Sequence, residues 1–393
     1  MSRLAVYFYC GAETPFQADI HALAESLKHF GADIYANKNW WLSGPDAKEP
    51  LFQHHPSFNP RSADIVICSK ASYRNIDENF QPVIHPFPQW LTNKQRKFFL
   101  VFLEEEDKYE PLSWYPPFTD FDLVLRTKSN QRAFRPNNFR PWQIGVSDYV
   151  LRRGLKKSRA RQKKIQILEN YNASHPFLHP LRDFAKKQIT PLFEKKIHIE
   201  KKIIKWDNEP DEPYDRFHQK QVGRYYNSHY HDLLAESAGC FSFCGQLIPG
   251  CPHNPSTYLA GGNRAKIQRM AWELISRLIG IQKRAIQWDS FRFWESLAFA
   301  CCPIHVDLER FGVQLPVMPK NWEHYIGLNP ENLKDEVARI IKDPQIMIRI
   351  GQQGQTWLQE NYGIVNLAKL FLAYVQEMQS DPFLDTKLRA IQG

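Results

Sequence analysis

Apolar residues in the first part of the chain fall into short runs separated by polar or longer helical segments. Five such runs predict buried strands, at residues 4–10, 32–36, 63–68, 97–103 and 121–127. A stretch with helical periodicity at 16–30 follows the first run. Short apolar strands that alternate with helices or long crossings are typical of a mostly parallel sheet covered on both faces.

A second α/β pattern follows a break in periodicity around residues 134–148, where two prolines occur. It comprises strand-like runs at 163–172, 195–203 and 239–245 and helical stretches at 179–193, 228–236 and 264–280. The 393 residues are too many for one ordinary core. We therefore expect an α/β protein of two domains, 1–150 and 151–393, with the last apolar helix, near 367–378, packing back on the first.

The segment 287–307 combines a loop, an amphipathic helix and a buried strand. Apolar residues recur at helical spacing, at Phe291, Trp294, Leu297, Ala298 and Cys301. Either Asp289 or Ser290 is a suitable N-cap, and Pro303 opens an apolar run that ends in Asp307.

The start of this predicted helix suits an anion, because its free N–H groups and positive dipole end attract phosphate. Arg292 adds a cation with bidentate geometry, and Glu295 can accept from a hydroxyl group such as that of a ribose. The structural alternative is an Arg292–Glu295 surface pair on a core helix.

Composition favours a globular cytosolic protein. No apolar run approaches the roughly 20 residues that span a bilayer, and the N-terminal run at 4–10 lacks the basic region and cleavage site of a signal peptide. Seven cysteines in a chain of this length fit reduced thiols better than a disulfide framework.

The positive charge is concentrated between residues 151 and 205, a segment that contains sixteen Lys and Arg residues and four acidic residues. Such a band can contact anionic lipid headgroups, nucleic acid or a phosphorylated substrate. A solvated surface is an equal alternative. Nucleic acid is the least favoured partner, because no nucleic-acid-binding signature accompanies the charge.

Two segments of the second domain resemble the exostosin-like group of GT-B glycosyltransferases. They are YHDLLAESAGCFSFCG (230–245) and the stretch at 287–307. In the second, the residues at or near the family's positions are Ser290, Arg292, Glu295, Ser296, Cys302 and Pro303. The resemblance covers about 80 residues and implies two Rossmann-like domains facing a central cleft, with a nucleotide-sugar donor held by the second. It places Glu295 on the ribose and basic groups on the diphosphate.

Three departures from this family concern the same region. Ala300 and Cys301 replace the usual glycine before the Cys-Pro turn, and Gln287 stands eight positions before Glu295, where many GT-B enzymes have a second glutamate. About forty residues separate Gly245 from Asp289, where the family is compact. That insertion is a candidate donor lid or acceptor wall.

Candidate residues for the chemistry lie in both domains. An inverting transfer needs a general base, and carboxylates follow two predicted strands, at Glu13 and at Glu104, Glu105 and Glu106; an ordinary solvated loop is the alternative. His21 and Asp19 are expected to be structural. Besides Asp289, Ser290, Arg292 and Glu295, the candidate donor-binding residues are the cations Lys220, Arg224, Arg264 and Lys266.

Two further groups of residues have a structural as well as a functional interpretation. Aromatic side chains in first-domain loops suit an acceptor sugar or core anchoring; they are Trp40, Trp41, Trp90, Trp114 and Tyr115. Cys240, Cys244, Cys251 and His253 could close a zinc tetrahedron, but they lack the Cys-x2-Cys spacing, and the first two fall on a predicted buried strand.

These observations predict a metal-independent glycosyltransferase without a cofactor, which uses a nucleotide-sugar donor of UDP or GDP type and a glycan, lipid or other hydroxyl acceptor. We expect it in the cytoplasm, with contact to an anionic membrane as an option and no nucleic-acid partner. The alternative is a catalytically inactive GT-B-like module that binds a nucleotide or an anionic surface as a regulator.

Overall fold

A computed structural model provides the coordinates of the chain. It describes residues 3–9, 18–69, 74–76, 82–84, 87–104, 118–133, 135–171, 179–201, 213–222, 228–250 and 263–392. Of the candidate residues, Glu13, Glu105, Glu106, Arg224, Trp114, Tyr115, Cys251 and His253 lie outside these ranges.

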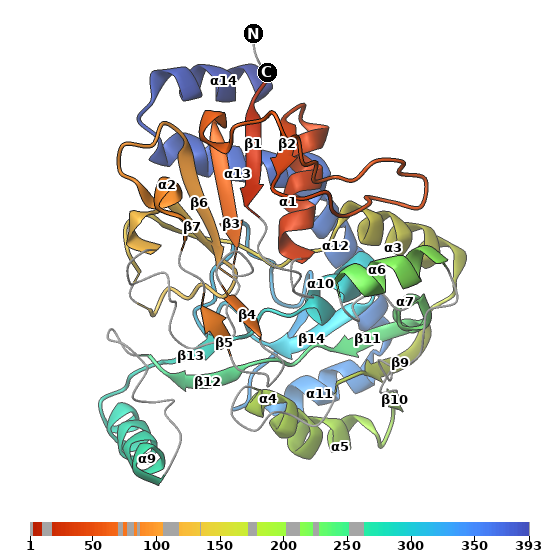
Figure 1. The fold of residues 1–393 in the computed structure, drawn as a ribbon. Coiled ribbons are helices and arrows are strands. Elements are labelled where there is room, and N and C mark those ends of the chain that lie inside the picture. The colour runs from red at the N-terminus through yellow and green to blue at the C-terminus, as the bar shows by residue number, and fades with distance from the viewer. Residues whose placement is uncertain are drawn as a thin grey trace.

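The first part of the chain forms a six-stranded parallel sheet in the order β2-β1-β3-β6-β7-β8 (Figure 1). Its strands are β1 (Ala5–Tyr9), β2 (Asp33–Ala36), β3 (Ile65–Ser69), β6 (Phe99–Glu104), β7 (Leu123–Arg126) and β8 (Phe139–Pro141). Every residue of β3 and β6 is buried, as expected for central strands covered on both faces. All five predicted strands are present, and each ends within one residue of its predicted end.

Shorter elements complete this part. They are helix α1 (Ala18–His29), the 3₁₀ turns Pro60–Ser62 and Phe118–Asp120, helix α2 (Gln89–Thr92) and an antiparallel pair, β4 (Arg74–Ile76) with β5 (Pro82–Ile84). Asn59 caps the first 3₁₀ turn by accepting from the backbone N–H of Arg61.

The second part forms a five-stranded parallel sheet in the order β10-β9-β11-β14-β15. Its strands are β9 (Lys164–Glu169), β10 (His198–Lys201), β11 (Ser237–Phe241), β14 (Cys302–Val306) and β15 (Ile326–Leu328). Its helices are α3 (Asp148–Ala160), α4 (Pro180–Phe184), a π-helical turn Ala185–Ile189, α5 (Thr190–Phe193), α6 (Pro213–Val222), α7 (Ser228–Glu236), α10 (Phe291–Ala298) and α11 (Leu333–Lys342). The expected fold class, α/β with two parallel Rossmann-like sheets, is confirmed.

Helix α3 begins at the predicted domain boundary. Ser147 is its N-cap and accepts from the backbone N–H of Val150. The sequence pattern predicted a break near residue 150, but helix α3 starts within that break. The helix was not predicted, because a capped helix with a strongly basic exposed face lacks a conspicuous apolar run. The division at residue 150 stays a prediction, and α3 packs against α7 and α10 of the second part.

The C-terminal helices return to the first sheet. They are α12 (Gln345–Tyr362), α13 (Ile364–Met378) and α14 (Pro382–Gln392). Helix α13 packs against α1, and Figure 1 shows α14 near the start of β1. Lys387 of α14 forms an ion pair with Asp64 at 2.7 Å, and both side chains are largely buried.

The insertion after Gly245 forms an antiparallel hairpin of β12 (Gln246–Pro249) and β13 (Lys283–Ile286), and helix α9 (Asn263–Leu278) leads into β13. The predicted helix 264–280 is confirmed. The hairpin was not predicted, because its strands are short and are bordered by glycines and prolines. In Figure 1, α9 projects beyond the second sheet. Within the described part of the chain, none of the helices is both long and apolar enough for a transmembrane span.

Candidate functional site

The helix start of α10 lies beyond the carboxyl ends of β9 and β11, where open α/β sheets bind ligands. Phe293, Trp294 and Leu297 are fully buried and anchor the helix in the core. Ser290 is the N-cap residue with an extended backbone, yet its hydroxyl caps no backbone N–H. Its Oγ is buried and has no hydrogen-bond partner among the described residues. A ligand at this helix start could therefore bond to both the hydroxyl and the open N–H groups.

The carboxylate of Asp289 is engaged by hydrogen bonds within the protein and does not face a ligand site as expected. Its carboxylate accepts hydrogen bonds from the indole N–H of Trp294 and, at 3.0 Å, from the backbone N–H of Ile144. Burial raises its pKa to about 7. The side chain thus links the segment that joins the two sheets to the start of α10, which favours a structural role.

Two arginines meet beside this helix start. Arg292 donates to the carbonyl of Asn170 at 3.4 Å and lies over the ring of Tyr171. Arg182 of α4 donates to the carbonyl of Phe243 and to the Sγ atom of Cys244. Burial, together with the nearby charge of Arg292, lowers the pKa of Arg182.

Neither guanidinium has a carboxylate partner within salt-bridge distance in the described ranges, although both are partly buried. Other buried arginines of the protein are paired, such as Arg153 with Asp215 at 2.6 Å. Two neighbouring cations without counterions carry an electrostatic cost that a bound anion would remove. Arg182 was not recognised as a site residue, because it is one of many cations in the band 151–205.

Glu295 is buried on the opposite side of α10 from solvent. Its Oε1 atom lies 3.8 Å from Nε2 of His231, and no ion pair joins the described side chains of Arg292 and Glu295. The interpretation of these two residues as a surface pair is therefore wrong, because residue 295 packs toward α7. The role of Glu295 in ribose binding stays a prediction.

Gln287 adopts a left-handed backbone conformation, with φ of 52°. Its side chain is buried, and neither amide atom has a partner among the described residues. A buried amide without a partner costs roughly 1–3 kcal/mol, so a ligand or water is expected to satisfy it. The sequence identified position 287 as a departure from the pattern of many GT-B enzymes, but it did not predict this environment.

Glu104 is the one candidate base that the structure describes. It is 1% exposed and forms an ion pair with Arg126 on the neighbouring strand. A carboxylate that is buried and paired in this way is poorly placed to meet an acceptor hydroxyl, and its geometry favours a structural role.

The remaining candidate cations are less well placed. Arg264 and Lys266 lie in the first turn of α9, which Figure 1 shows far from α10. Lys220 lies in α6. The structure does not describe the side chains of these three residues, so their predicted contacts with phosphate stay predictions.

The first-domain aromatic residues are divided between core and surface. Trp41 is fully buried, and the ring of His21 stacks on it, so both residues anchor the core. Trp40 is half-buried and packs edge-on against Trp41, while Trp90 meets Tyr9 in the same way. Core anchoring is therefore the correct interpretation for Trp41.

The proposed zinc ligands Cys240 and Cys244 are both buried, and burial raises the pKa of Cys240 to about 11. No group of three potential metal ligands occurs among the residues whose placement is described. Cys240 behaves there as a small apolar residue.

Ion pairs neutralise much of the basic band 151–205. Lys157 of α3 and Arg161, the C-cap of that helix, contact Asp232 of α7, and Arg161 also contacts Glu236. Arg153 is buried against Asp215. These pairs hold α3, α6 and α7 together and favour a structural role for the first half of the band.

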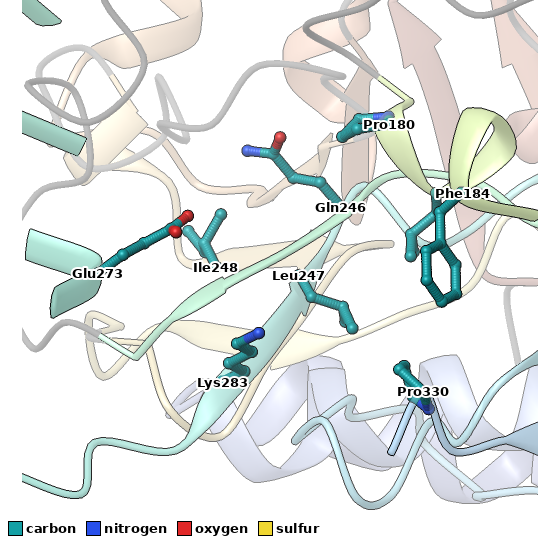
Figure 2. Close-up of a pocket in the computed structure, with 9 residues that line it drawn as sticks. Pro180, Phe184, Gln246, Leu247, Ile248, Glu273, Lys283 and Pro330 are labelled. Carbon is teal, nitrogen blue, oxygen red and sulfur yellow. The ribbon is translucent and has the colours of Figure 1, made fainter. Parts of the chain in front are cut away.

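A cavity of about 380 Å³ lies between α4, the β12–β13 hairpin and α9 (Figure 2). Its walls include Leu181, Phe184 and Leu247, with Glu273 and Lys283 at one side. Leu181 and Phe184 flank Arg182 in the sequence, so α4 contributes to both the cavity and the arginine pair.

No protein-family model matches the chain, and no curated protein matches it. Solved structures of similar fold include an alpha-glucosyltransferase in complex with UDP-glucose and DNA containing an abasic site (10% identity; 96% of this chain and 99% of that chain; TM-score 0.49). HepE of Anabaena in complex with UDP-glucose (8% identity; 95% and 99%; TM-score 0.44) and a glycosyltransferase of Rickettsia africae (11% identity; 96% and 99%; TM-score 0.46) are also similar.

Proposed function

We propose that the protein is a GT-B glycosyltransferase that moves a sugar from a nucleotide-sugar donor to a hydroxyl acceptor. The observation that carries the proposal is the pair Arg182 and Arg292, two partly buried cations beside the open start of α10. A nucleoside diphosphate supplies the two adjacent negative groups that such a pair requires. The resemblance of 230–245 and 287–307 to the exostosin-like group supports the same assignment.

The two arginines would act when the bond between sugar and diphosphate breaks. Negative charge then develops on the departing diphosphate, and fixed cations with helix N–H groups stabilise it without rearranging. Ser290 would donate its hydroxyl to a phosphate oxygen, because this group has no other partner in the described part of the site. In this proposal no metal is needed to neutralise the leaving group.

Glu295 and Gln287 would bind the uncharged parts of the donor. Glu295 would accept from a ribose hydroxyl, and the buried amide of Gln287 can both donate to and accept from sugar hydroxyls. A Gln at residue 287 would hold the sugar without adding charge. If the enzyme inverts the configuration of the anomeric carbon, the general base would be Glu13, Glu105 or Glu106, which lie outside the described residues.

The decisive experiment measures binding and hydrolysis of a panel of UDP-, GDP-, TDP- and CMP-sugars. We expect one donor to raise the melting temperature of the protein and to turn over slowly, and Arg292→Ala to abolish both effects. Arg292→Lys keeps the charge but loses the bidentate geometry, so it should retain a small part of the affinity. Arg349→Ala removes an exposed arginine and serves as the control.

The outcomes separate the proposed enzyme from its alternative. Binding of a nucleotide-sugar without turnover in the presence of any sugar or lipid acceptor would favour an inactive nucleotide-binding module. Absence of both binding and turnover for the whole panel would overturn the glycosyltransferase assignment. We further propose a carbohydrate or lipid-linked acceptor and a cytoplasmic location.

A further inference from the structure

Helix α9 presents an apolar face to solvent. Ile267, Met270, Leu274 and Leu278 are 67%, 65%, 61% and 78% exposed. Their spacing places them on one side of the helix. Ile279, immediately after the helix, is also exposed. Soluble proteins rarely expose a contiguous apolar face of this kind, and such faces usually mark an interaction surface.

The opposite side of α9 faces the protein. Ser276 is 2% exposed, and Glu273 lines the cavity beside the β12–β13 hairpin. Figure 2 shows the Glu273 side chain extending toward Ile248 of β12. The helix packs through Ser276 and the half-buried Trp272, and it turns its large aliphatic residues outward, which is the reverse of an ordinary surface helix.

Basic residues outnumber acids on the helix that carries this apolar face. The sequence of α9 contains four basic residues and a single acid, and Arg277 is exposed. Lys195 and Lys196 are also exposed, in the turn between α5 and β10. Figure 1 places α9 and α5 at the same end of the molecule. A second copy docked on α9 would bring like charges together, whereas an anionic surface would complement them.

We propose that α9 docks the protein on an anionic lipid surface. Its apolar face enters the boundary between headgroups and acyl chains, while Arg277, Lys195 and Lys196 contact lipid phosphates. The docking surface is thus the inserted hairpin and α9, not the first half of the basic band, whose cations are paired. The inference is independent of the proposed donor site, which lies at the start of α10.

Sedimentation with vesicles tests the docking surface. The full chain is mixed with vesicles of phosphatidylcholine alone or of equal parts phosphatidylglycerol and phosphatidylcholine, at about 0.1 M and about 1 M salt. We expect binding to the anionic vesicles, weaker binding at high salt, and a loss of about tenfold or more in Leu278→Glu. Ile267→Glu should have the same effect.

Phe383→Glu provides the matched control. Phe383 is 64% exposed on α14, which Figure 1 places at the other end of the molecule, and the charge change is identical. This variant should bind vesicles as well as the unmodified protein does, and UDP should raise the melting temperatures of all variants equally. Equal vesicle binding by Leu278→Glu and Phe383→Glu would overturn the proposal.

Analytical ultracentrifugation tests the competing occupant, a second copy of the chain. We expect a monomer at micromolar concentration in the absence of lipid. A dimer that Leu278→Glu dissociates, combined with no vesicle binding, would show that α9 is a protein interface and would also overturn the proposal.

Discussion

The backbone N–H of Ile144 donates a hydrogen bond of 3.0 Å to the carboxylate of Asp289. Ile144 belongs to the segment that follows the last strand of the first sheet, and Asp289 directly precedes the cap of α10. The same carboxylate accepts from the buried indole of Trp294. One side chain therefore fixes the start of the candidate donor helix relative to both sheets.

Substitution of Asp289 should destabilise the protein. Asp289→Ala leaves two buried donors unsatisfied, and we expect a loss of about 2–4 kcal/mol in the free energy of unfolding. Asp289→Asn keeps one acceptor and should lose about half as much. Urea denaturation measures both, with Asp183→Asn as the control, because the Asp183 side chain is 50% exposed and forms an i,i+4 pair with the exposed Lys187. An equally small effect for all three variants would contradict the structural role of Asp289.

Substitution of Arg182 should weaken ligand binding with little effect on the stability of the protein. Arg182→Ala removes one of two neighbouring cations and leaves no carboxylate unpaired, so we expect unfolding to change by less than about 1 kcal/mol. Nucleoside diphosphate affinity should fall about tenfold or more, measured by calorimetry.

Arg126→Ala is the contrasting variant. It removes the cation that pairs with the buried carboxylate of Glu104, and we expect a loss of about 3 kcal/mol or more in the free energy of unfolding. If Arg182→Ala proved as destabilising as Arg126→Ala and left diphosphate affinity unchanged, Arg182 would be a structural residue.

Two glycines with the same backbone conformation should differ in their tolerance of alanine. Gly245 and Gly280 have φ of 71° and 70°. A Cβ at Gly245 would lie 1.9 Å from the carbonyl oxygen of Ile286, whereas a Cβ at Gly280 meets nothing within 4 Å. Gly280→Ala should cost about 1 kcal/mol from left-handed strain alone, and Gly245→Ala more than about 3 kcal/mol. Thermal unfolding of the two variants checks this, and equal losses would show that the approach of Gly245 to the hairpin is not tight.

Glu25 should make stability depend on pH. Burial raises its pKa from 4.5 to about 7, although it accepts hydrogen bonds from the backbone N–H of Asp148 and the indole of Trp41. The unfolded chain then releases this proton at lower pH than the folded protein does. The stability associated with Glu25 is therefore present below about pH 4.5 and is lost as pH rises to about 7.

Glu25→Gln removes this titration while keeping an oxygen that can accept. The difference in the free energy of unfolding, variant minus unmodified protein, should increase between pH 4.5 and 7 and then stay constant. Denaturant titrations across this range measure the difference. Asp289, whose pKa is also raised, is present in both proteins, so its contribution cancels. A difference that does not vary with pH would show that Glu25 titrates normally.

Most of the secondary structure around the site could be predicted from local patterns. The all-buried strand β6 is a continuous apolar run, and α10 has apolar residues at helical spacing after a serine cap. The hairpin β12–β13 and helix α3 were not predicted, because short strands among glycines and a helix with a basic face give weak local signals. Elements with strong periodicity were thus predictable, and those stabilised by distant contacts were not.

The sequence by itself determined the two parallel sheets, the position of α10 and the cationic nature of Arg292, because these depend on residue type and spacing within short segments. Only the tertiary structure decided that Arg182 stands beside Arg292, that Glu295 turns toward His231 and that Glu104 is neutralised by Arg126. These pairs join residues far apart in the chain, and burial and charge balance depend on every neighbour in space. The outward apolar face of α9 likewise became visible only when its packing against the hairpin was known.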